Sequence, residues 1–342
     1  MGKIKYWLIV GFIILFAIFY IAISDRDSTL SRLKSAGENG DVEAQYALGL
    51  MYLYGEILDV DYQQAKIWYE KAADQNDPRA QAKLGVMYAN GLGVSQDYQH
   101  AKMWYEKAAA QNDERAQVNL AVLYAKGNGV EQDYRQAKSW YEKAAAQNSP
   151  DAQFALGILY ANANGVEQDY QQAKDWYEKA AEQNFANAQF NLGMLYYKGE
   201  GVKQNFRQAR EWFEKAASQN QLNAQYNLGQ IYYYGQGVTQ SYRQAKDWFE
   251  KAAEKGHVDA QYNLGVIYEN GEGVSQNYQQ AKAWYEKAAS QNDAQAQFEL
   301  GVMNELGQGE SIDLKQARHY YERSCNNGLK KGCERLKELL DK

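Results

Sequence analysis

Residues 260–289 are AQYNLGVIYENGEGVSQNYQQAKAWYEKAA, and close copies of this stretch recur at an offset of thirty-six residues along the 342-residue chain. The offset aligns Trp68, Trp104, Trp140, Trp176, Trp212, Trp248 and Trp284, with Tyr320 in the eighth place. It also aligns Gly49, Gly85, Gly157, Gly193, Gly229, Gly265 and Gly301, with Ala121 in the remaining copy. A fixed period of this length is typical of a solenoid, in which each copy is one supersecondary unit.

Each unit contains two segments with helical periodicity. Ala44 and Leu48 belong to the apolar stripe of the first segment, and Ala65, Trp68 and Tyr69 to that of the second. Residues that favour helix N-caps precede the second segments at Asp61, Asp97, Asp133, Asp169, Asn205, Ser241, Asn277 and Asp313. One helix pair has too little interior to fold alone, so the pattern predicts an all-α fold in which neighbouring units bury each other's aromatic side chains.

Glycines interrupt this pattern at two kinds of position. The glycine column that includes Gly49 lies inside the first helix, where glycine costs about 1 kcal/mol relative to alanine, so we expect a close steric neighbour there. A Gly-x-Gly-Val stretch separates the two helices in most units and predicts a turn with positive φ. Ile57 and Ala163 replace a glycine of this turn, so we expect locally altered turns in those two units.

The N-terminus carries an apolar segment, 7–23, without a charged residue. Its length of roughly 25 Å at helical rise is just enough to span a bilayer. Lys3 and Lys5 precede it and Asp25 follows, which predicts a cytoplasmic N-terminus and a repeat body outside the cytoplasm, in the periplasm or an equivalent compartment. The segment is either an uncleaved single-pass anchor or, because Ala22 and Ser24 place small residues at its end, a cleaved signal peptide of a secreted protein; the remaining alternative is a buried core helix.

Four regions follow from these patterns. They are a transmembrane or signal segment (1–24), a linker with an N-terminal capping half-repeat (25–40), eight repeats of thirty-six residues (41–328) and a C-terminal capping helix (329–342). The net charge is -6 and the basic side chains are scattered among acidic ones, which argues against a nucleic-acid partner.

The repeated motif resembles the Sel1-like repeat, a relative of the tetratricopeptide repeat. Ala-Gln-Tyr-Asn-Leu-Gly, then Gly-x-Gly-Val, then Ala-Lys-x-Trp-Tyr/Phe-Glu-Lys-Ala-Ala carries the resemblance over 41–328. The family implies a right-handed superhelical solenoid of antiparallel helix pairs that acts as an adaptor in membrane-associated and cell-envelope complexes. The last unit is similar to a cysteine-rich branch of the family, which implies a disulfide between Cys325 and Cys333. The alternative is two buried thiols.

No catalytic constellation is visible in the sequence. His100, His257 and His319 are far apart and lack metal-ligand spacing, and no Ser-x-x-Lys motif of a penicillin-recognising enzyme occurs in a suitable context. We therefore expect a non-catalytic protein with no cofactor, no metal and no small-molecule substrate. Because some cysteine-rich relatives are described as binding or hydrolysing penicillins, a β-lactam-binding protein is one alternative, and a structural spacer is another.

Partner binding is better argued from first-helix positions that vary between otherwise uniform units. If the first helices line the concave surface, this variable stripe faces a protein or peptide partner. Asparagine amides there offer both donors and an acceptor for an extended backbone, and tyrosines offer flat amphipathic contact area. The predicted partner-binding residues are Asn119, Asn191, Asn227, Asn263, Tyr197, Tyr233 and Tyr234. The alternative is that the asparagines are solvated or bond between repeats and that the tyrosines fill gaps between repeats.

Overall fold

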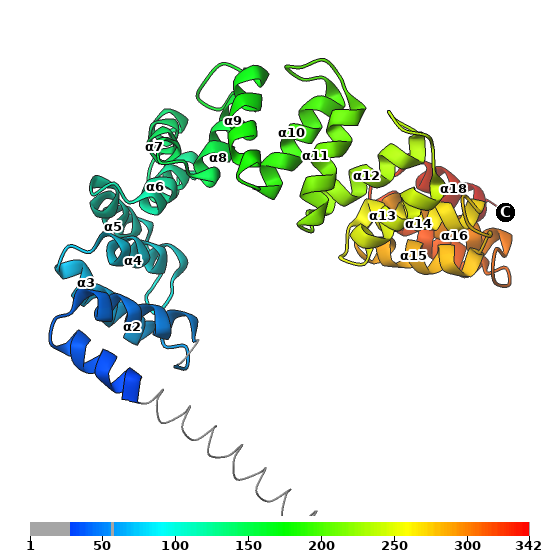
Figure 1. Cartoon of the computed structure of the whole chain (residues 1–342). Helices are drawn as coiled ribbons and strands as arrows, with labels where there is room; N and C mark the ends of the chain where they lie inside the picture. Colours follow the sequence, from blue (N-terminus) through cyan, green and yellow to red (C-terminus); the bar gives the residue numbers. More distant parts are fainter. Residues whose placement is uncertain (1–27, 56–57, 342) are drawn as a thin grey trace, which may run out of the picture. The chain divides into compact units, whose positions relative to one another are not determined.

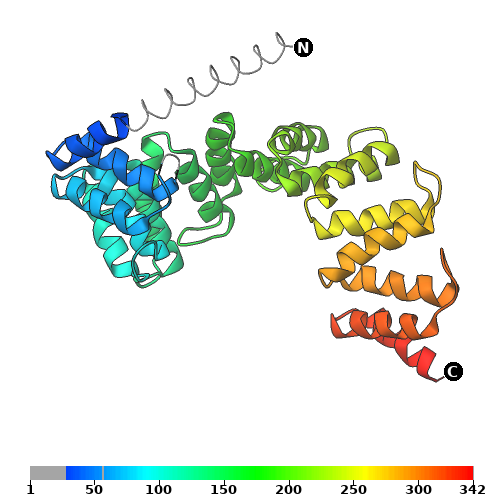
Figure 2. The same ribbon diagram turned by 90° about the horizontal axis from the view of Figure 1, so that it is seen from below.

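The computed structural model describes residues 28–55 and 58–341, and all regular structure in these residues is helical (Figures 1 and 2). A short helical segment occupies 28–38. The helices that follow are α2 (Val42–Tyr54), α3 (Tyr62–Asp74), α4 (Pro78–Asn90), α5 (Tyr98–Ala110), α6 (Glu114–Lys126), α7 (Tyr134–Ala146), α8 (Pro150–Ala161), α9 (Tyr170–Glu182), α10 (Ala186–Lys198), α11 (Phe206–Ser218), α12 (Leu222–Tyr234), α13 (Tyr242–Ala253), α14 (Val258–Asn270), α15 (Tyr278–Ser290), α16 (Ala294–Leu306), α17 (Leu314–Asn326) and α18 (Lys330–Leu340). The prediction of an all-helical repeat solenoid is confirmed.

The contacts divide the chain into two compact units. Unit 1 consists of Met1–Leu159 and Asn164–Val166, and unit 2 of Tyr160–Ala163 and Glu167–Lys342. In unit 1 the first helices α2, α4 and α6 lie along the inner side of a curve and the second helices α3, α5 and α7 along its outer side (Figure 1). The first helices α4 and α6 also contact one another directly, as α14 and α16 do in unit 2.

The predicted capping residues begin the second helices. Asp61 accepts a hydrogen bond from the backbone N–H of Gln64, and each counterpart of Asp61, through Asp313, also caps its helix with its side chain. An N-cap of this kind contributes about 1 kcal/mol. The sequence therefore predicted the start of every second helix correctly.

The glycine column inside the first helices lies beneath an aromatic ring of the second helix. A Cβ added at Gly265 would lie 2.3 Å from Cε1 of Tyr285, and one added at Gly229 would lie 2.4 Å from Cε1 of Phe249. These rings are the largest fully buried side chains of their repeats. The predicted close neighbour is thus the ring that forms the centre of each unit's core.

Both glycines of the Gly-x-Gly turn have a structural role. Gly127 ends α6 in the left-handed conformation, and Gly129 lies against the backbone and Cβ of Tyr98, the first residue of α5 in the preceding repeat. Ala163 keeps the left-handed conformation with φ 58°, and α8 is one residue shorter than the other first helices, so the expectation of an altered turn is confirmed only in part. Ile57 lies outside the described residues.

The aligned tryptophans are less central than the sequence suggests. Trp104 packs, partly buried, against the core cluster built around Tyr69 in the preceding repeat. A lysine three residues later lies over each of the seven indole rings, for example Lys107 at 4.2 Å and Lys143 at 3.6 Å from the ring centroid. Trp140, Trp248 and Trp284 likewise pack against the core cluster of the preceding repeat, so these indoles join two repeats and also carry a cation.

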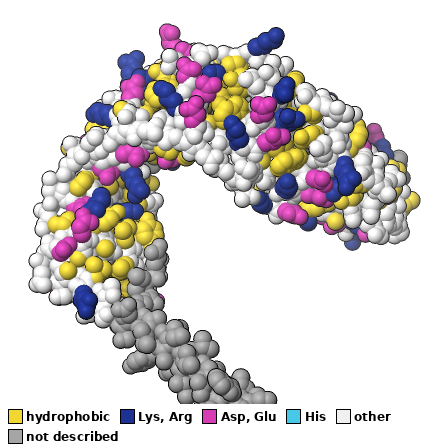
Figure 3. Space-filling view, in the orientation of Figure 1, with side chains coloured by type: hydrophobic (Ala, Val, Ile, Leu, Met, Phe, Trp, Pro, Cys, Tyr) yellow, Lys and Arg dark blue, Asp and Glu magenta, His cyan; other side chains and the backbone are white. Residues whose placement is uncertain are grey.

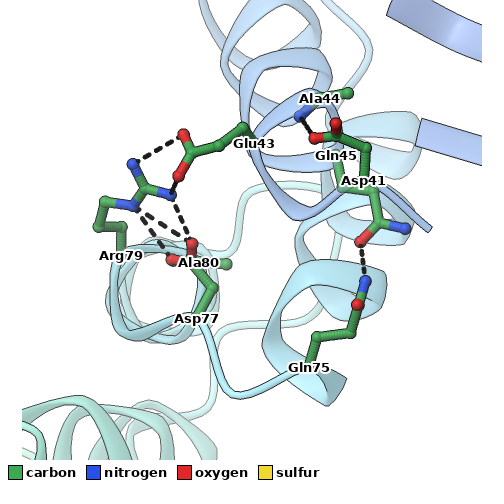
Figure 4. A network of polar contacts seen from close by, with 8 residues as sticks. All are labelled: Asp41, Glu43, Ala44, Gln45, Gln75, Asp77, Arg79 and Ala80. Carbon is green, nitrogen blue, oxygen red and sulfur yellow. Dashed lines mark hydrogen bonds and ion pairs between the residues drawn. The ribbon is translucent and has the colours of Figure 1, made fainter. Parts of the chain in front are cut away.

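A ladder of buried amides connects the repeats, and the sequence analysis did not identify it. Its members are the first-helix glutamines Gln45, Gln81, Gln117, Gln153, Gln189, Gln225, Gln261 and Gln297, all nearly inaccessible to water. Gln75, at the end of α3, donates to Oε1 of Gln45 at 2.9 Å (Figure 4), and Gln111 donates to Gln81 at the same distance. Gln81 also donates to Oδ1 of Asn76, whose positive φ places its amide at the junction of two repeats. The ladder satisfies polar groups that would otherwise be costly to bury.

The amide ladder is interrupted in the sixth repeat, and this defect leads to a prediction. Lys255 occupies the place of the donor glutamine and bonds to Asn220, while the buried Oε1 of Gln225 has no partner among the described residues. We expect Lys255→Gln to raise the free energy of unfolding by about 1–2 kcal/mol, because a buried acceptor gains its hydrogen bond. Urea denaturation would measure the change. The matched control is Lys203→Gln, which removes the same charge from an exposed turn; an equal effect of both would contradict the prediction.

The predictions for the two chain ends concern an N-terminal apolar segment and a C-terminal disulfide. The predicted transmembrane or signal segment lies outside the described residues, and no helix within 28–55 and 58–341 combines the length and apolar character needed to cross a membrane. At the other end, Cys325 and Cys333 form the predicted disulfide, with 4.6 Å between their Cα atoms. The disulfide joins α17 to α18.

Candidate functional site

The predicted partner-binding residues all lie in first helices. Asn119 belongs to α6 in unit 1, and the other six lie in unit 2, on α10, α12 and α14. The four asparagines are half-buried. We call the two variable first-helix columns that begin at Ala47 and Tyr54 the first-helix stripe; it contains the four asparagines and Tyr234, and Tyr197 and Tyr233 each precede a stripe residue.

Hydrogen bonds within the fold engage three of the asparagines. The side chain of Asn191 bonds to the hydroxyl of Tyr177 in the preceding repeat, and that of Asn263 bonds to the hydroxyl of Tyr226. Asn227 donates through Nδ2 to the carbonyl oxygen of Asn223, one turn earlier, at 2.7 Å. Bonding between repeats, the alternative to partner binding, therefore occurs at two of the positions, although one bond leaves an amide with further donor and acceptor capacity.

The three tyrosines have different environments. Tyr197 packs edge-on against Phe206 with ring centroids 5.3 Å apart, and its hydroxyl donates to Oε1 of Gln236 at 2.9 Å. Tyr233 packs in the same way against Tyr242 at 5.2 Å. These two rings fill gaps in the core. Tyr234 is 61% exposed and is the one of the three that presents most of its ring to water.

A pocket opens on the first-helix stripe of unit 1. It has a volume of about 320 Å³ and is lined by residues of the first three repeats, among them Tyr46, Arg79, Lys83, Arg115 and Asn119. The guanidinium of Arg79 lies over the ring of Tyr46, 4.5 Å from its centroid. The sequence predicts Asn119 as a binding residue, and Lys83 belongs to the same column of the stripe; Arg79 and Arg115 lie outside the stripe and were not predicted.

Carboxylates balance the cations of this pocket. Arg79 forms two hydrogen bonds to Glu43, at 2.6 and 3.0 Å, and also bonds to Asp77 (Figure 4). Burial raises the pKa of Asp77, but hydrogen bonds from Arg79 and from the backbone N–H of Ala80, together with the charge of Arg79, lower it below its usual value. Acidic and basic side chains are likewise interspersed over the face of the molecule seen in Figure 3. The pocket can therefore recognise mixed polar groups rather than a polyanion.

The stripe of unit 2 contains a pocket of about 310 Å³ that is lined by Asn191. Tyr177, Phe190 and Met194 contribute its apolar surface, and Lys198 and Glu200 lie at its polar side. Two of the seven predicted residues, Asn119 and Asn191, thus line pockets. Both pockets are large enough to hold a side chain, and the surface that lines the unit 2 pocket is more polar than apolar.

Glu299 continues the first-helix stripe in the last repeat and provides a prediction about pH. Burial, followed by the negative charge of Glu269, raises the pKa of Glu299 from 4.5 to about 7, against the opposing charge of Lys331. Because the folded pKa lies above the unfolded one, the folded state loses stability as the pH rises from about 4.5 through about 7. We expect Glu299→Gln to stabilise the protein by about 1 kcal/mol at pH 8.5, after allowance for partial exposure, and to change little at pH 4. Denaturation at the two pH values measures this, and an equal effect at both would contradict it.

The histidines have structural contacts. Nδ1 of His100 lies 2.6 Å from Asp97, the N-cap of its own helix, and His257 caps α14 while its ring stacks on Tyr226 at 4.5 Å. Among the residues that the structure describes, no group of three or more His, Cys, Asp or Glu side chains is placed to hold a metal ion.

Comparison with known proteins identifies the repeats. A family model of the Sel1 repeat matches eight consecutive stretches, at 42–77, 78–113, 114–149, 150–185, 186–221, 222–257, 258–293 and 294–329. These boundaries lie one residue after those deduced from the sequence. The comparison with curated proteins gave no match.

Two solved structures resemble the chain over most of its length. The first is c5321, a protective antigen of uropathogenic Escherichia coli with an SLR fold; it is 37% identical with a TM-score of 0.81, and the match covers 90% of this chain and 66% of that one. The second is a Sel1 repeat protein from Oxalobacter formigenes, 32% identical with a TM-score of 0.69, covering 90% of this chain and 89% of that one. Sel1-repeat proteins generally mediate protein–protein interactions. With eight matched repeats and these two relatives, the chain belongs to the Sel1 repeat family.

Proposed function

We propose that this protein is a non-catalytic scaffold of the cell envelope that binds a peptide or protein through its first-helix stripe. The observation that carries the proposal is that the stripe contains two pockets, one in each unit, on an otherwise regular array. A solenoid offers an extended surface along which successive repeats contact successive parts of a ligand. The variable side chains of the stripe then supply specificity.

The proposed location rests on the N-terminal segment and on the cysteines. The apolar stretch 7–23, with lysines before it and aspartates after it, favours delivery of the body out of the cytoplasm. A disulfide such as Cys325–Cys333 persists in oxidising compartments and is rare in the cytosol. A reporter that is active only outside the cytoplasm, fused after Lys342, tests this part; a reporter active only inside would overturn it.

Affinity capture tests the binding surface. The full-length chain, solubilised from membranes, is used to capture partners that are then identified by mass spectrometry. We expect the combined change of Asn191 and Tyr234 to alanine to reduce recovery of specific partners at least tenfold. The matched control is Arg207→Ala on the second helix α11, where the side chain is largely exposed. Unchanged capture by the stripe variant, or equal loss with the control, would count against the stripe as the binding surface.

A further inference from the structure

The pocket of about 310 Å³ in unit 2 lies beside Ala161, at a position where the two preceding repeats also have alanine (Ala89 and Ala125) and the next two repeats have tyrosine. Ala161, the last residue of α8, lines this pocket. The equivalent positions in the next two repeats, thirty-six and seventy-two residues later, are Tyr197 and Tyr233. Their phenol rings fill the corresponding space and pack against the core. The pocket is therefore a place that the protein fills with tyrosine in two neighbouring repeats.

The three positions share one backbone hydrogen bond, although α8 ends one residue earlier in its repeat than α10 and α12 do. A glutamine seven residues later donates to the carbonyl oxygen of each residue: to Ala161 at 2.8 Å, to Tyr197 at 2.9 Å and to Tyr233 at 2.8 Å. The neighbouring rings are also retained, because Tyr170 in the pocket corresponds to Phe206 beside Tyr197. The surroundings for a phenol ring are thus present at Ala161 without the ring.

The pocket also offers a hydrogen-bond acceptor for the hydroxyl of a phenol ring. Tyr197 donates its hydroxyl hydrogen to Oε1 of Gln236, which lies between the two glycines of the following turn. The residue that corresponds to Gln236 one repeat earlier is Glu200, which lines the pocket. Its carboxylate lies 3.7 Å from the ammonium group of Lys198. In the next repeat Glu272 lies close to Tyr233 and, after burial, raises the pKa of its hydroxyl, so a carboxylate lies near this position there.

Tyr177 is a further difference from the filled repeats, where phenylalanine lies beneath the tyrosine. Its hydroxyl is bonded to Asn191, and the pocket remains open with that hydroxyl present. A cavity of roughly 150 Å³ is enough to hold a benzene molecule, so the space is sufficient for a phenol side chain. Asn162 and Asn191, whose amides lie at the pocket, are placed to bond the backbone of a peptide that carries such a side chain.

We propose that this pocket binds a tyrosine side chain of the peptide or protein partner, with the tyrosine hydroxyl donating to Glu200. The inference rests on the proposed function and names the chemistry that the first-helix stripe recognises. The partner's ring takes the place that Tyr197 and Tyr233 take in their own repeats. A neutral phenol donor is preferred over phenylalanine, because phenylalanine would leave the carboxylate without the hydrogen bond.

Binding of N-acetyl-L-tyrosinamide to the full-length chain tests the pocket directly, by ligand-observed NMR titration. We expect weak saturable binding, with N-acetyl-L-phenylalaninamide binding about tenfold more weakly, as expected for loss of one hydrogen bond to a charged group. Ala161→Tyr fills the pocket with the side chain that the next repeat uses and should abolish binding. If Ala161→Tyr binds the tyrosine amide as well as the unaltered chain does, or if the unaltered chain does not bind it, the proposal is overturned.

Two further measurements keep folding and recognition separate. Ala161→Tyr should melt no lower than the unaltered chain, because tyrosine already occupies the equivalent place twice. Glu200→Gln reproduces the residue found at Gln236 and should retain binding while reducing the preference for tyrosine over phenylalanine at least threefold. An unchanged preference would overturn the assignment of Glu200.

The same variants distinguish failure of the pocket from failure of the scaffold function. If the unaltered chain and Ala161→Tyr capture the same partners equally well, the scaffold function stands, but the pocket is not the site that recognises them. Absence of any specific partner with the unaltered chain would overturn the scaffold function itself. A loss of capture with Ala161→Tyr that parallels the loss of tyrosine-amide binding is the result we expect.

Discussion

Replacing Phe249 by alanine will lower the free energy of unfolding by about 3–5 kcal/mol. Its ring is 1% exposed and belongs to a core cluster formed by α12, α13 and α14. Gly229 lies directly beneath the ring and has no side chain that could move into the space. Because Phe249 has no hydroxyl, the measured loss reports on packing alone. Urea denaturation of the full-length chain, followed by circular dichroism, measures the effect.

The matched control for Phe249→Ala is Lys251→Ala, two residues later on the same helix. The ammonium group of Lys251 lies 3.8 Å from the ring centroid of Trp248 at the surface, an interaction worth about 0.5–1 kcal/mol. The difference in unfolding free energy between the two variants compares the two aromatic positions of the repeat. Phe249 forms the core, whereas Trp248 packs between repeats beneath the ammonium group of Lys251. Equal effects of the two variants would show that the buried ring is not the centre of the repeat.

The sequence predicted the features that recur in all or nearly all units. These features are the period, the N-caps from Asp61 to Asp313 and the glycines at positions such as Gly265. Each depends on residues within a single unit, so every copy of the repeat provides the same signal. The position of the core was less certain, because Trp284 and Tyr285 are adjacent and helical periodicity allows either to point inward. Only the packing of neighbouring helices shows that the ring of Tyr285 covers Gly265.

The amide ladder could not be predicted from amphipathic pattern. A glutamine such as Gln81 counts as polar in an amphipathic pattern. It is buried because it bonds to Gln111, at the end of the second helix of its own repeat, and to Asn76, at the end of the preceding repeat. The pocket at Ala161 could not be predicted either, because Ala89 and Ala125 occupy the same position in the two preceding repeats and the sequence does not distinguish Ala161 from them.

The predicted binding residues show the same limit. The variable column predicts Asn191, which lines a pocket, whereas Tyr197 and Tyr233 pack against phenylalanine rings of the core. Variation between repeats thus marks both recognition and alternative packing solutions. A recognition residue can be distinguished from a packing residue only by its contacts in the structure, such as the contact of Tyr197 with Phe213.

Replacing both cysteines by serine will destabilise the C-terminal cap by about 2.5 kcal/mol, the chain-entropy value for closing a short loop. The disulfide connects residues eight apart in sequence and joins α17 to α18. In α18, Gly332 alone is fully buried; the other attachments include two hydrogen bonds from Arg335 to Glu305, at 2.8 and 2.9 Å. A helix with so little buried surface depends strongly on its covalent link.

The effect should be local, because each repeat of a solenoid contacts only its neighbours. Hydrogen exchange should therefore accelerate about fiftyfold or more in Lys330–Leu340 of the double serine variant, while protection in α12 and α13 stays unchanged. Reducing the unaltered protein with dithiothreitol should reproduce the pattern, which controls for the serine side chains themselves. If α18 stays protected after reduction, the contacts of Arg335 and Gly332 hold the cap without the disulfide, and the covalent link has no structural role in closing the array.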